Sequence, residues 1–376
     1  MKKKLLFTLL PIASAFTFVS AGCNGNAEES KLIKIYMPSD GMEYTNDVQQ
    51  KEMLDIINPK LKKYNIQAEF QKAGGDDKVT LNDVLTNDNV IAFPAVSKYY
   101  LDNANYLDST NVFMRTLTNA FKNNLSSAGY SEGEDNYLIK QAKNQNEIFN
   151  SHNGYANWPS KDYINSTYEW CYEPNKTVGW QRGSIWIMGT DEELAKIKEA
   201  WNTRNYEEFR KFGIIMGKED SGSKYLLPQA LFRKQFNKYF ANSSFSEELN
   251  NAQLSSYYTK SLKAKDMGKQ KSYKIAFDNE MAFAYTKSDG KKYVVNQKEN
   301  PGAKLEILTV TDAIPYNIGV ASKNIKQDIL NAILDGFKET VKLNKNFVGV
   351  AYGFNDYAAV TNVNDEIIKM CKEAGI

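Results

Sequence analysis

Three predicted strands that alternate with two predicted helices constrain the fold of this chain most strongly. Apolar residues alternate or run together at 32–37, 66–71 and 90–93, which is typical of strands. Between them, apolar residues recur at helical spacing over 47–63, and 79–85 has the pattern of a shorter helix. Strands and helices in this order form a mostly parallel sheet covered by helices. The sequence therefore predicts an α/β protein.

The loops after two of these strands are candidate ligand-binding segments. Ligands of open α/β sheets bind beyond the carboxyl ends of the strands. Ser39 and Asp40 follow the first strand, and Ser97 follows the third. We expect these three side chains to face a cleft.

A second series of strands and helices is predicted after residue 183. Its elements are strands at 184–188, 212–216 and 304–310 and helices at 190–201, 224–240, 324–341 and 365–372. Thr190 and Glu193 form a capping box at the start of the first of these helices. A chain of this length with two such series is expected to fold into two domains.

The N-terminus has the pattern of a lipoprotein signal. Lys2–Lys4 precede an apolar run over 5–18, and Ser20, Ala21 and Gly22 stand directly before Cys23. We expect residues 1–22 to be a signal peptide, Cys23 to carry the lipid (a palmitate among its chains), and the polar residues 23–30 to form a tether. The alternatives are a plain signal peptide and an uncleaved anchor, although the run is shorter than the about 20 residues of a membrane span.

Charge and composition exclude several classes of function. The formal charge falls from +2 to −1 when the three lysines of residues 1–22 are removed, so no basic surface for nucleic acid is predicted. Cys171 and Cys371 lie 200 positions apart, and no pattern predicts that they pair. With His152 as the single histidine, we expect no metal site.

Residues 125–180 are polar, rich in aromatic residues and without clear periodicity. Long irregular segments are uncommon and are often functional. Trp158, Tyr168, Trp170 and Trp180 lie in this segment and together suggest a stacking site for a flat ligand. The alternative is that each ring only seals a local cluster.

The strongest local signal is residues 216–228, where a strand leads through a loop of small residues into a helix. Ser221 and Ser223 stand at the helix start, where free backbone N–H groups attract anions such as phosphate. The spacing of Gly217 and Gly222 resembles a Walker A loop, but Ser223 and Lys224 are in reversed order, so we reject an NTPase. The alternative is that the serines only cap the helix.

Two acids and a tyrosine follow a strand-like segment at 273–277. In a cleft, Asp278 and Glu280, with Tyr285 nearby, would bind a ligand's amino group or cation; otherwise they are surface groups. The sequence has no HExxH or GxSxG motif and no nucleophile that is matched to a histidine. We therefore expect no catalytic residues, no resident cofactor and no enzyme activity.

Residues 221–228 resemble the phosphonate and phosphite substrate-binding lipoproteins of ABC importers, which have a serine-rich helix start followed by Tyr-Leu-x-Pro. Residues 314–317 and 353–354 match that family in register. Within that family, the chain is more similar to the mycoplasma thiamine-pyrophosphate-binding lipoproteins. This similarity is found at residues 180–187, 194–202, 212–214, Phe277 and 310–311. The resemblance is dense over about 155–355 and departs at Gly41–Met42, where the family has a larger, aromatic-bearing pair.

The resemblance implies a type II periplasmic-binding-protein-like fold with two lobes, each a mixed sheet flanked by helices, and a ligand cleft between them. Lobe one would be residues 31–181 plus 312–376, and lobe two residues 182–311. The chain would cross between the lobes near Gln181 and Asp312, which would act as a hinge.

The resemblance also implies a ligand and roles for the candidate residues. The diphosphate of thiamine pyrophosphate would bind at Ser221 and Ser223 with help from Arg182. Its thiazolium and aminopyrimidine rings would stack on Trp158, Trp180 or Tyr316. Asp278 or Glu280 would accept the amino group. The remaining candidates in the implied site are Pro315, Asn317 and Tyr285.

The predicted function is that of an extracytoplasmic, lipid-anchored and monomeric binding protein that delivers thiamine pyrophosphate, or thiamine, to an ABC permease and its ATPase. The first alternative is a phosphonate or other phosphorylated solute as ligand. A surface adhesin, whose Trp-rich loops would be contact patches, is the alternative from another class. A secreted nuclease or phosphatase is a third, weakened by the lack of metal-ligand clusters.

Overall fold

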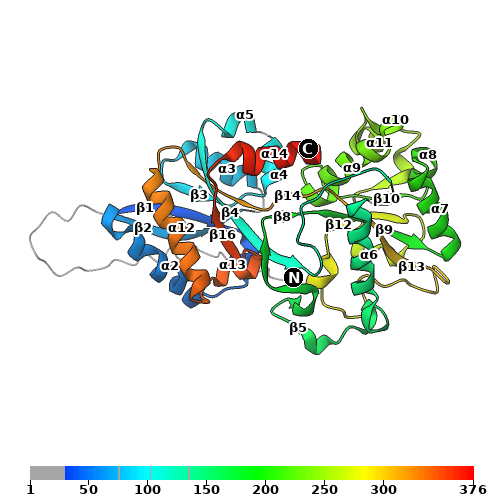
Figure 1. Ribbon diagram of the computed structural model, residues 1–376, viewed down its shortest axis with the longest axis horizontal. Coiled ribbons are helices and arrows are strands. Elements are labelled where there is room, and N and C mark those ends of the chain that lie inside the picture. The colour runs from blue at the N-terminus through cyan, green and yellow to red at the C-terminus, as the bar shows by residue number, and fades with distance from the viewer. Residues whose placement is uncertain (1–29, 75–76, 102, 134–135) are drawn as a thin grey trace, which may run out of the picture.

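A computed structural model describes residues 30–74, 77–101, 103–133 and 136–376 of the chain. The predicted signal peptide and Cys23 lie outside these residues. Figure 1 shows two lobes side by side along the long axis of the molecule. Within the described residues, every helix is too short or too polar to cross a membrane.

The first lobe is built on a seven-stranded mixed sheet with the order β16-β4-β15-β3-β1-β2, and β7 pairs with the far part of β4. The predicted parallel part is present, because β1 pairs in parallel with β2 and β3, while β15 runs antiparallel to β3 and β4. The strands are β1 (Lys31–Met37), β2 (Ile66–Lys72), β3 (Val90–Ala92), β4 (Thr110–Phe121), β7 (Tyr172–Val178), β15 (Ile318–Ser322) and β16 (Asp356–Ala359).

Helices cover both faces of this sheet. One face packs against α2 (Asp47–Leu61) and α12 (Gln327–Lys342), whose apolar stripes include Met53, Ile333 and Phe337. Gly336 lets these helices approach closely, since a Cβ there would lie 3.0 Å from the Cα of Ile57. The other face packs against α3 (Asp77–Thr86) and α14 (Lys369–Ala374).

The second lobe is built on a five-stranded sheet with the order β11-β10-β12-β9-β13. Its central strand β9 (Gly183–Gly189) is buried along its whole length and pairs antiparallel with both neighbours, β12 and β13. The other strands are β10 (Ile214–Ile215), β11 (Tyr258–Thr259), β12 (Ile275–Asn279) and β13 (Lys304–Val310). The predicted strand over 212–216 is thus only two residues long.

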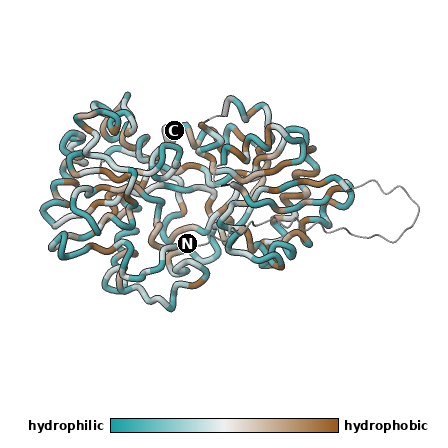
Figure 2. Tube along the Cα trace, turned by 180° about the vertical axis from the view of Figure 1, so that it is seen from behind, coloured by the Kyte–Doolittle hydropathy of each residue, from teal (hydrophilic) through white to brown (hydrophobic). Residues whose placement is uncertain are grey.

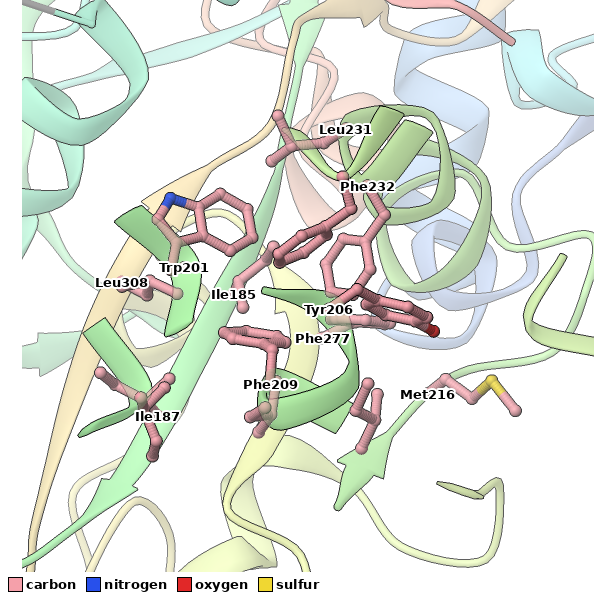
Figure 3. Packing of buried hydrophobic residues seen from close by; sticks show 14 of the residues in the cluster. Ile185, Ile187, Trp201, Tyr206, Phe209, Met216, Leu231, Phe232, Phe277 and Leu308 are labelled. Carbon is pink, nitrogen blue, oxygen red and sulfur yellow. The ribbon is translucent and has the colours of Figure 1, made fainter. Parts of the chain in front are cut away.

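Aromatic residues fill the space between one face of this sheet and its helices, and Figure 3 shows Trp201, Phe209 and Phe232 packed together there. The helices are α7 (Asp191–Asn202), α8 (Tyr206–Arg210), α9 (Leu227–Gln235), α10 (Asn237–Phe240) and α11 (Phe245–Asn250). The predicted capping box of α7 is confirmed, because Thr190 Oγ1 accepts from Glu193 N and the Glu193 carboxylate accepts from Thr190 N. In Figure 2 the hydrophobic segments of both lobes lie mainly in such interior elements.

The segment predicted to be irregular contains α6 (Tyr137–Phe149), which the sequence analysis missed. This helix packs along β13, and Phe149, Trp158 and Tyr168 join the second lobe's core around Trp186. The prediction placed all of 31–181 in lobe one. The structure instead packs 137–171 against the second sheet, because that is where its apolar residues are buried.

Two short strands lie where the chain passes between the lobes. β8 (Trp180–Gln181) pairs antiparallel with β14 (Ile314–Pro315), so that the two crossings run side by side in the middle of Figure 1. A paired double crossing lets two lobes rotate while they stay connected, which is the geometry expected of a hinge.

Candidate functional site

The loops after β1 and β3 lead into two short helices, which carry the predicted residues Ser39, Asp40 and Ser97. β1 leads into α1 (Ser39–Glu43), where Ser39 is half-buried and Asp40 is exposed, and β3 leads into α4 (Val96–Leu101). Ser97 on α4 is buried, and its Oγ would lie 3.2 Å from a Cβ on Gly222 of the second lobe. The Ser97 loop and the predicted helix start therefore meet between the lobes.

The helix start has the form that the sequence predicted. Residues Gly222–Leu226 make one π-helical turn (η6) that continues into α9, and Ser221 is its N-cap, with Oγ accepting from Lys224 N at 3.4 Å. Ser223 is buried and hydrogen-bonds to the side chain of Asn279. The first turn of such a helix presents N–H groups without intrahelical partners, so an anion is favoured there.

Asp278 lies beside this helix start at the end of β12. It is buried, and its Oδ1 is 3.1 Å from Lys224 Nζ while its Oδ2 accepts from Tyr293 OH at 2.7 Å. The carboxylate therefore holds Lys224 close to the helix start. The paired ammonium group is a hydrogen-bond donor next to the positive end of the helix dipole.

Glu280 lies deeper than the sequence analysis expected. Its Oε1 accepts from Asn124 Nδ2 at 2.9 Å and from Gln145 Nε2 at 2.7 Å. Burial raises the pKa of Glu280, and the nearby Arg182 opposes this shift. Asn124 lies before α6 and Gln145 lies within it, so these contacts occupy one oxygen of a carboxylate that was predicted to accept a ligand amino group.

Arg182 also differs from its predicted role. It is buried, and its guanidinium donates to the carbonyl oxygens of Thr311 at 2.8 Å and of Ser126 and Ala128, both at 2.9 Å. The fork that was expected to grip a diphosphate is occupied by backbone acceptors. Arg182 therefore ties both crossings to the loop at 126–128.

The predicted stacking tryptophans lie in different environments. Trp158 is 2% exposed and packs among Tyr155, Tyr168, Trp170 and Phe283, so neither face of its ring is open to a ligand. The local-cluster alternative describes this residue. Trp180 is half-buried on β8, opposite the buried Pro315 of β14.

Four tyrosines gather between the lobes, and we call Tyr172, Tyr285, Tyr316 and Tyr352 the interlobe tyrosines. Burial raises the pKa of Tyr285 well above its ordinary value, and Asp278, Tyr172 and Tyr316 are close enough to act on it. Burial likewise raises the pKa of Tyr316, with further effects of Tyr352 and Tyr172. Tyr285 nevertheless keeps 38% of its surface exposed, so part of this residue is accessible to a ligand.

Two acidic groups of the first lobe act electrostatically on Tyr352. Burial raises the pKa of Tyr352 to about 12, and Asp77 and Asp40 act in the same direction. Asn317 is also near Tyr352, and its Nδ2 donates to the carbonyl of Phe93 at 2.9 Å. Asp40, Tyr285, Tyr316 and Asn317 were predicted site residues that the structure brings together.

Sequence reasoning missed Tyr172 and Tyr352. Tyr352 directly precedes the Gly353–Phe354 pair that matched the phosphonate-binding family, so that match could have indicated it. Tyr172 stood in the aromatic segment without any local signal of its own. Groups of His, Cys, Asp and Glu suited to a metal ion do not occur in the described part of the chain.

The two lobes, the paired crossings and the polar, tyrosine-lined region between them define the class of protein. It is a two-lobed substrate-binding protein. Residues 42–375 match the CypI family model, described as extracytoplasmic thiamine-binding lipoprotein, and the chain therefore belongs to that family.

Individual relatives agree with this family. The high affinity transport system protein p37 of Mycoplasma pneumoniae is 30% identical over 279 residues, which are 70% of this chain and 71% of the relative. The p37 protein of Mesomycoplasma hyorhinis is 34% identical over 265 residues, which are 69% of this chain and 64% of the relative.

Solved structures show the same fold. Mycoplasma hyorhinis Mh-p37, described as a candidate thiamine pyrophosphate transporter, matches with a TM-score of 0.82 and 26% identity over 92% of this chain and 98% of that chain. XAC2383 from Xanthomonas citri, with ATP bound, matches with a TM-score of 0.50 and 9% identity over 92% of this chain and 97% of that chain, which shows the fold alone. The predicted family and two-lobed α/β fold are confirmed. The family consists of substrate-binding transport proteins, which confirms that the chain is not an enzyme.

Proposed function

We propose that this protein captures thiamine pyrophosphate between its two lobes and delivers it to an ABC permease with its ATPase. The observation that supports this most is the arrangement of the helix start and the interlobe tyrosines. Ser221, Ser223 and Lys224 make an anion site on the second lobe. Tyrosine rings with carboxylates beside them make a cation site next to it. Thiamine pyrophosphate carries an anionic diphosphate and a cationic ring on one molecule.

The diphosphate binds at the first turn of η6. Backbone N–H groups and the Ser221 hydroxyl donate to its oxygens, the Ser223 hydroxyl exchanges its hydrogen bond to Asn279 for one to the ligand, and the Lys224 ammonium is a further donor. Hydrogen bonds to a charged group are worth about 1.5–3 kcal/mol each, so two or three account for much of a micromolar affinity.

The thiazolium and aminopyrimidine rings bind against the interlobe tyrosines. A ligand cation over a tyrosine face gains about 0.5–2 kcal/mol, more where water is excluded. Asp40 and Asp77 strengthen the attraction for a cation, since both act electrostatically at Tyr352. Because these groups come from the first lobe and the serines from the second, the ligand favours the state in which both lobes contact it.

The remaining parts of the proposal concern where the protein works. A diacylated Cys23 would hold the mature chain at the extracytoplasmic face of the membrane, since two acyl chains suffice for stable anchoring. The ligand is cargo, and we propose that the protein has no resident cofactor and acts as a monomer.

Ligand retained during purification tests this function. Native mass spectrometry of protein from its own cells should show an added mass that matches thiamine pyrophosphate and is released by denaturation. Retention of a phosphonate instead would move the proposal to that ligand class. An absence of any small molecule, together with no binding of added thiamine compounds, would contradict it.

A further inference from the structure

A second polar site lies on the second lobe and shares no residue with the helix start at Ser221 and Ser223. It is a cavity of about 490 Å³ around the short 3-10 helix η8 (Ala264–Lys269). Its lining residues are Ser261, Leu262, Lys263, Lys265, Asp266, Lys269, Gln270 and Lys292. This volume is within the about 300–1,000 Å³ of small-molecule sites.

The charge of the lining is strongly positive. Four of the eight lining residues are lysines and one is an acid, which gives the lining a formal charge of +3. Asp266 already pairs with two of the lysines, at 2.6 Å from Lys269 Nζ and 2.7 Å from Lys292 Nζ. Lys263 and Lys265 have no carboxylate partner among the residues that the structure describes. The cavity therefore has positive charge that the protein itself does not neutralise.

The base of the cavity is held firmly. The side chains of Ala264 and Met267 are buried in the lobe core, and Tyr293 N donates to Lys265 O at 2.9 Å. Gly268 presses against the next segment so closely that a Cβ there would lie 2.1 Å from Val294 O. The lysines are thus mounted on a fixed backbone, which reduces the ordering cost of binding.

We propose that this cavity is a second anion site, and that it takes a phosphate or diphosphate group. Lysine ammonium groups are compact point charges with three donors each, which suits a multivalent oxyanion. The site is separate from the proposed transport site, so it does not depend on thiamine pyrophosphate being the cargo. The phosphate group would come either from a soluble phosphorylated compound or from a lipid headgroup.

Calorimetry with inorganic pyrophosphate tests this proposal on the full chain. Wild-type protein is expected to bind pyrophosphate in the cavity, and saturation with thiamine pyrophosphate should leave part of that binding intact. Lys265→Gln with Lys292→Gln should weaken the remaining binding by about tenfold or more, since each lost charge-assisted hydrogen bond counts. Lys265→Arg with Lys292→Arg keeps the charges and should bind nearly as well.

A matched control separates the cavity from general surface charge. Lys287→Gln with Lys298→Gln removes two exposed lysines of the same lobe that do not line the cavity, and it should leave pyrophosphate binding unchanged. Sedimentation with phosphatidylglycerol vesicles, compared with phosphatidylcholine vesicles, tests whether the phosphate group belongs to a lipid headgroup.

Loss of pyrophosphate binding confined to the cavity variant supports a soluble source. Loss confined to phosphatidylglycerol binding supports a lipid source. Equal losses in the cavity and control variants would overturn the proposal, as would no binding in either arm. If variants of Ser221 and Ser223 bind thiamine pyrophosphate normally, the proposed transport site is wrong. The result for the cavity does not depend on that outcome.

Discussion

Lys98 on α4 of the first lobe forms an ion pair with Asp220 of the second lobe, directly before the Ser221 helix cap. The Lys98 side chain is 15% exposed and that of Asp220 is 45% exposed. The pair bridges the lobes at the place where the anion is proposed to bind. This ion pair therefore couples closure of the two lobes to the proposed ligand site.

Reversing one of these charges should open the molecule. Lys98→Asp or Asp220→Lys alone is expected to weaken ligand affinity by about two- to tenfold, because partly exposed ion pairs contribute about 1 kcal/mol and like charges repel. The double exchange should recover most of the loss. Small-angle scattering should show a larger radius of gyration for the single variants with ligand present, and unchanged closure in both would contradict the role of the pair.

The same pair predicts a pH dependence. Hydrogen bonding to Lys98 lowers the pKa of the Asp220 carboxyl, against an opposing effect of burial. Because its pKa is lowered in the paired state, this carboxyl stabilises that state at pH values above its ordinary pKa of about 3.9. The stabilisation is lost as the pH falls through the lowered pKa. Closure measured by scattering should persist from neutral pH to about pH 4 and weaken only below it. Asp220→Asn should remove this acid dependence, and a dependence that survives the substitution must come from another group.

The helix-start serines should discriminate between diphosphate and free thiamine. Ser221→Ala with Ser223→Ala is expected to weaken thiamine pyrophosphate by about tenfold or more and free thiamine much less, because only the diphosphate accepts their hydrogen bonds. Calorimetry with both ligands measures the difference. If both affinities fall equally, the serines act only as helix caps.

Arg182 should matter for stability and little for the ligand. Arg182→Met leaves buried carbonyl acceptors without donors and Glu280 without its nearby cation, which should cost about 3–5 kcal/mol. Arg204→Gln is the control, since Arg204 is 36% exposed and pairs with the exposed Glu132, so its loss should cost less than about 0.5 kcal/mol. Denaturant unfolding measures both. If Arg182→Met leaves the stability unchanged but strongly weakens binding of the diphosphate, Arg182 contacts the ligand as the sequence analysis predicted.

Substitutions at Trp158 and Tyr316 should distinguish a residue of the core from a residue of the ligand site. Trp158→Ala is expected to destabilise the fold by about 3–5 kcal/mol, because it empties a packed aromatic cluster. Tyr316→Ala should instead weaken thiamine and its diphosphate by about tenfold while pyrophosphate alone binds as before. Thermal unfolding and calorimetry are the two measurements, and the reverse pattern would place the stacking site at Trp158.

Local patterns in the sequence predicted those parts of the molecule that depend on neighbours in the chain. Ser221 and Ser223 were found because a strand, a loop and a helix start follow one another within a dozen residues. The capping box at Thr190 is local in the same sense. The first three strands could likewise be placed from periodicity alone.

The missed features depend on contacts between distant segments. The interlobe tyrosines come from four separate segments of the chain, so no spacing in the sequence relates Tyr172 to Tyr352. The role of Arg182 was misassigned because a sequence does not show which acceptors reach a guanidinium. Helix α6 was missed because its buried face includes the polar residues Gln141 and Gln145 beside Leu138, Ala142 and Phe149, which interrupts the apolar periodicity.

Calorimetric titration of the purified protein with thiamine pyrophosphate, thiamine and inorganic pyrophosphate tests the central claim most directly. The account predicts that thiamine pyrophosphate binds with a Kd of about 1 μM or tighter, or about −8 kcal/mol, and binds more tightly than either fragment, because both the anion and the cation sites are used. No heat and no thermal stabilisation with thiamine pyrophosphate or thiamine would contradict it.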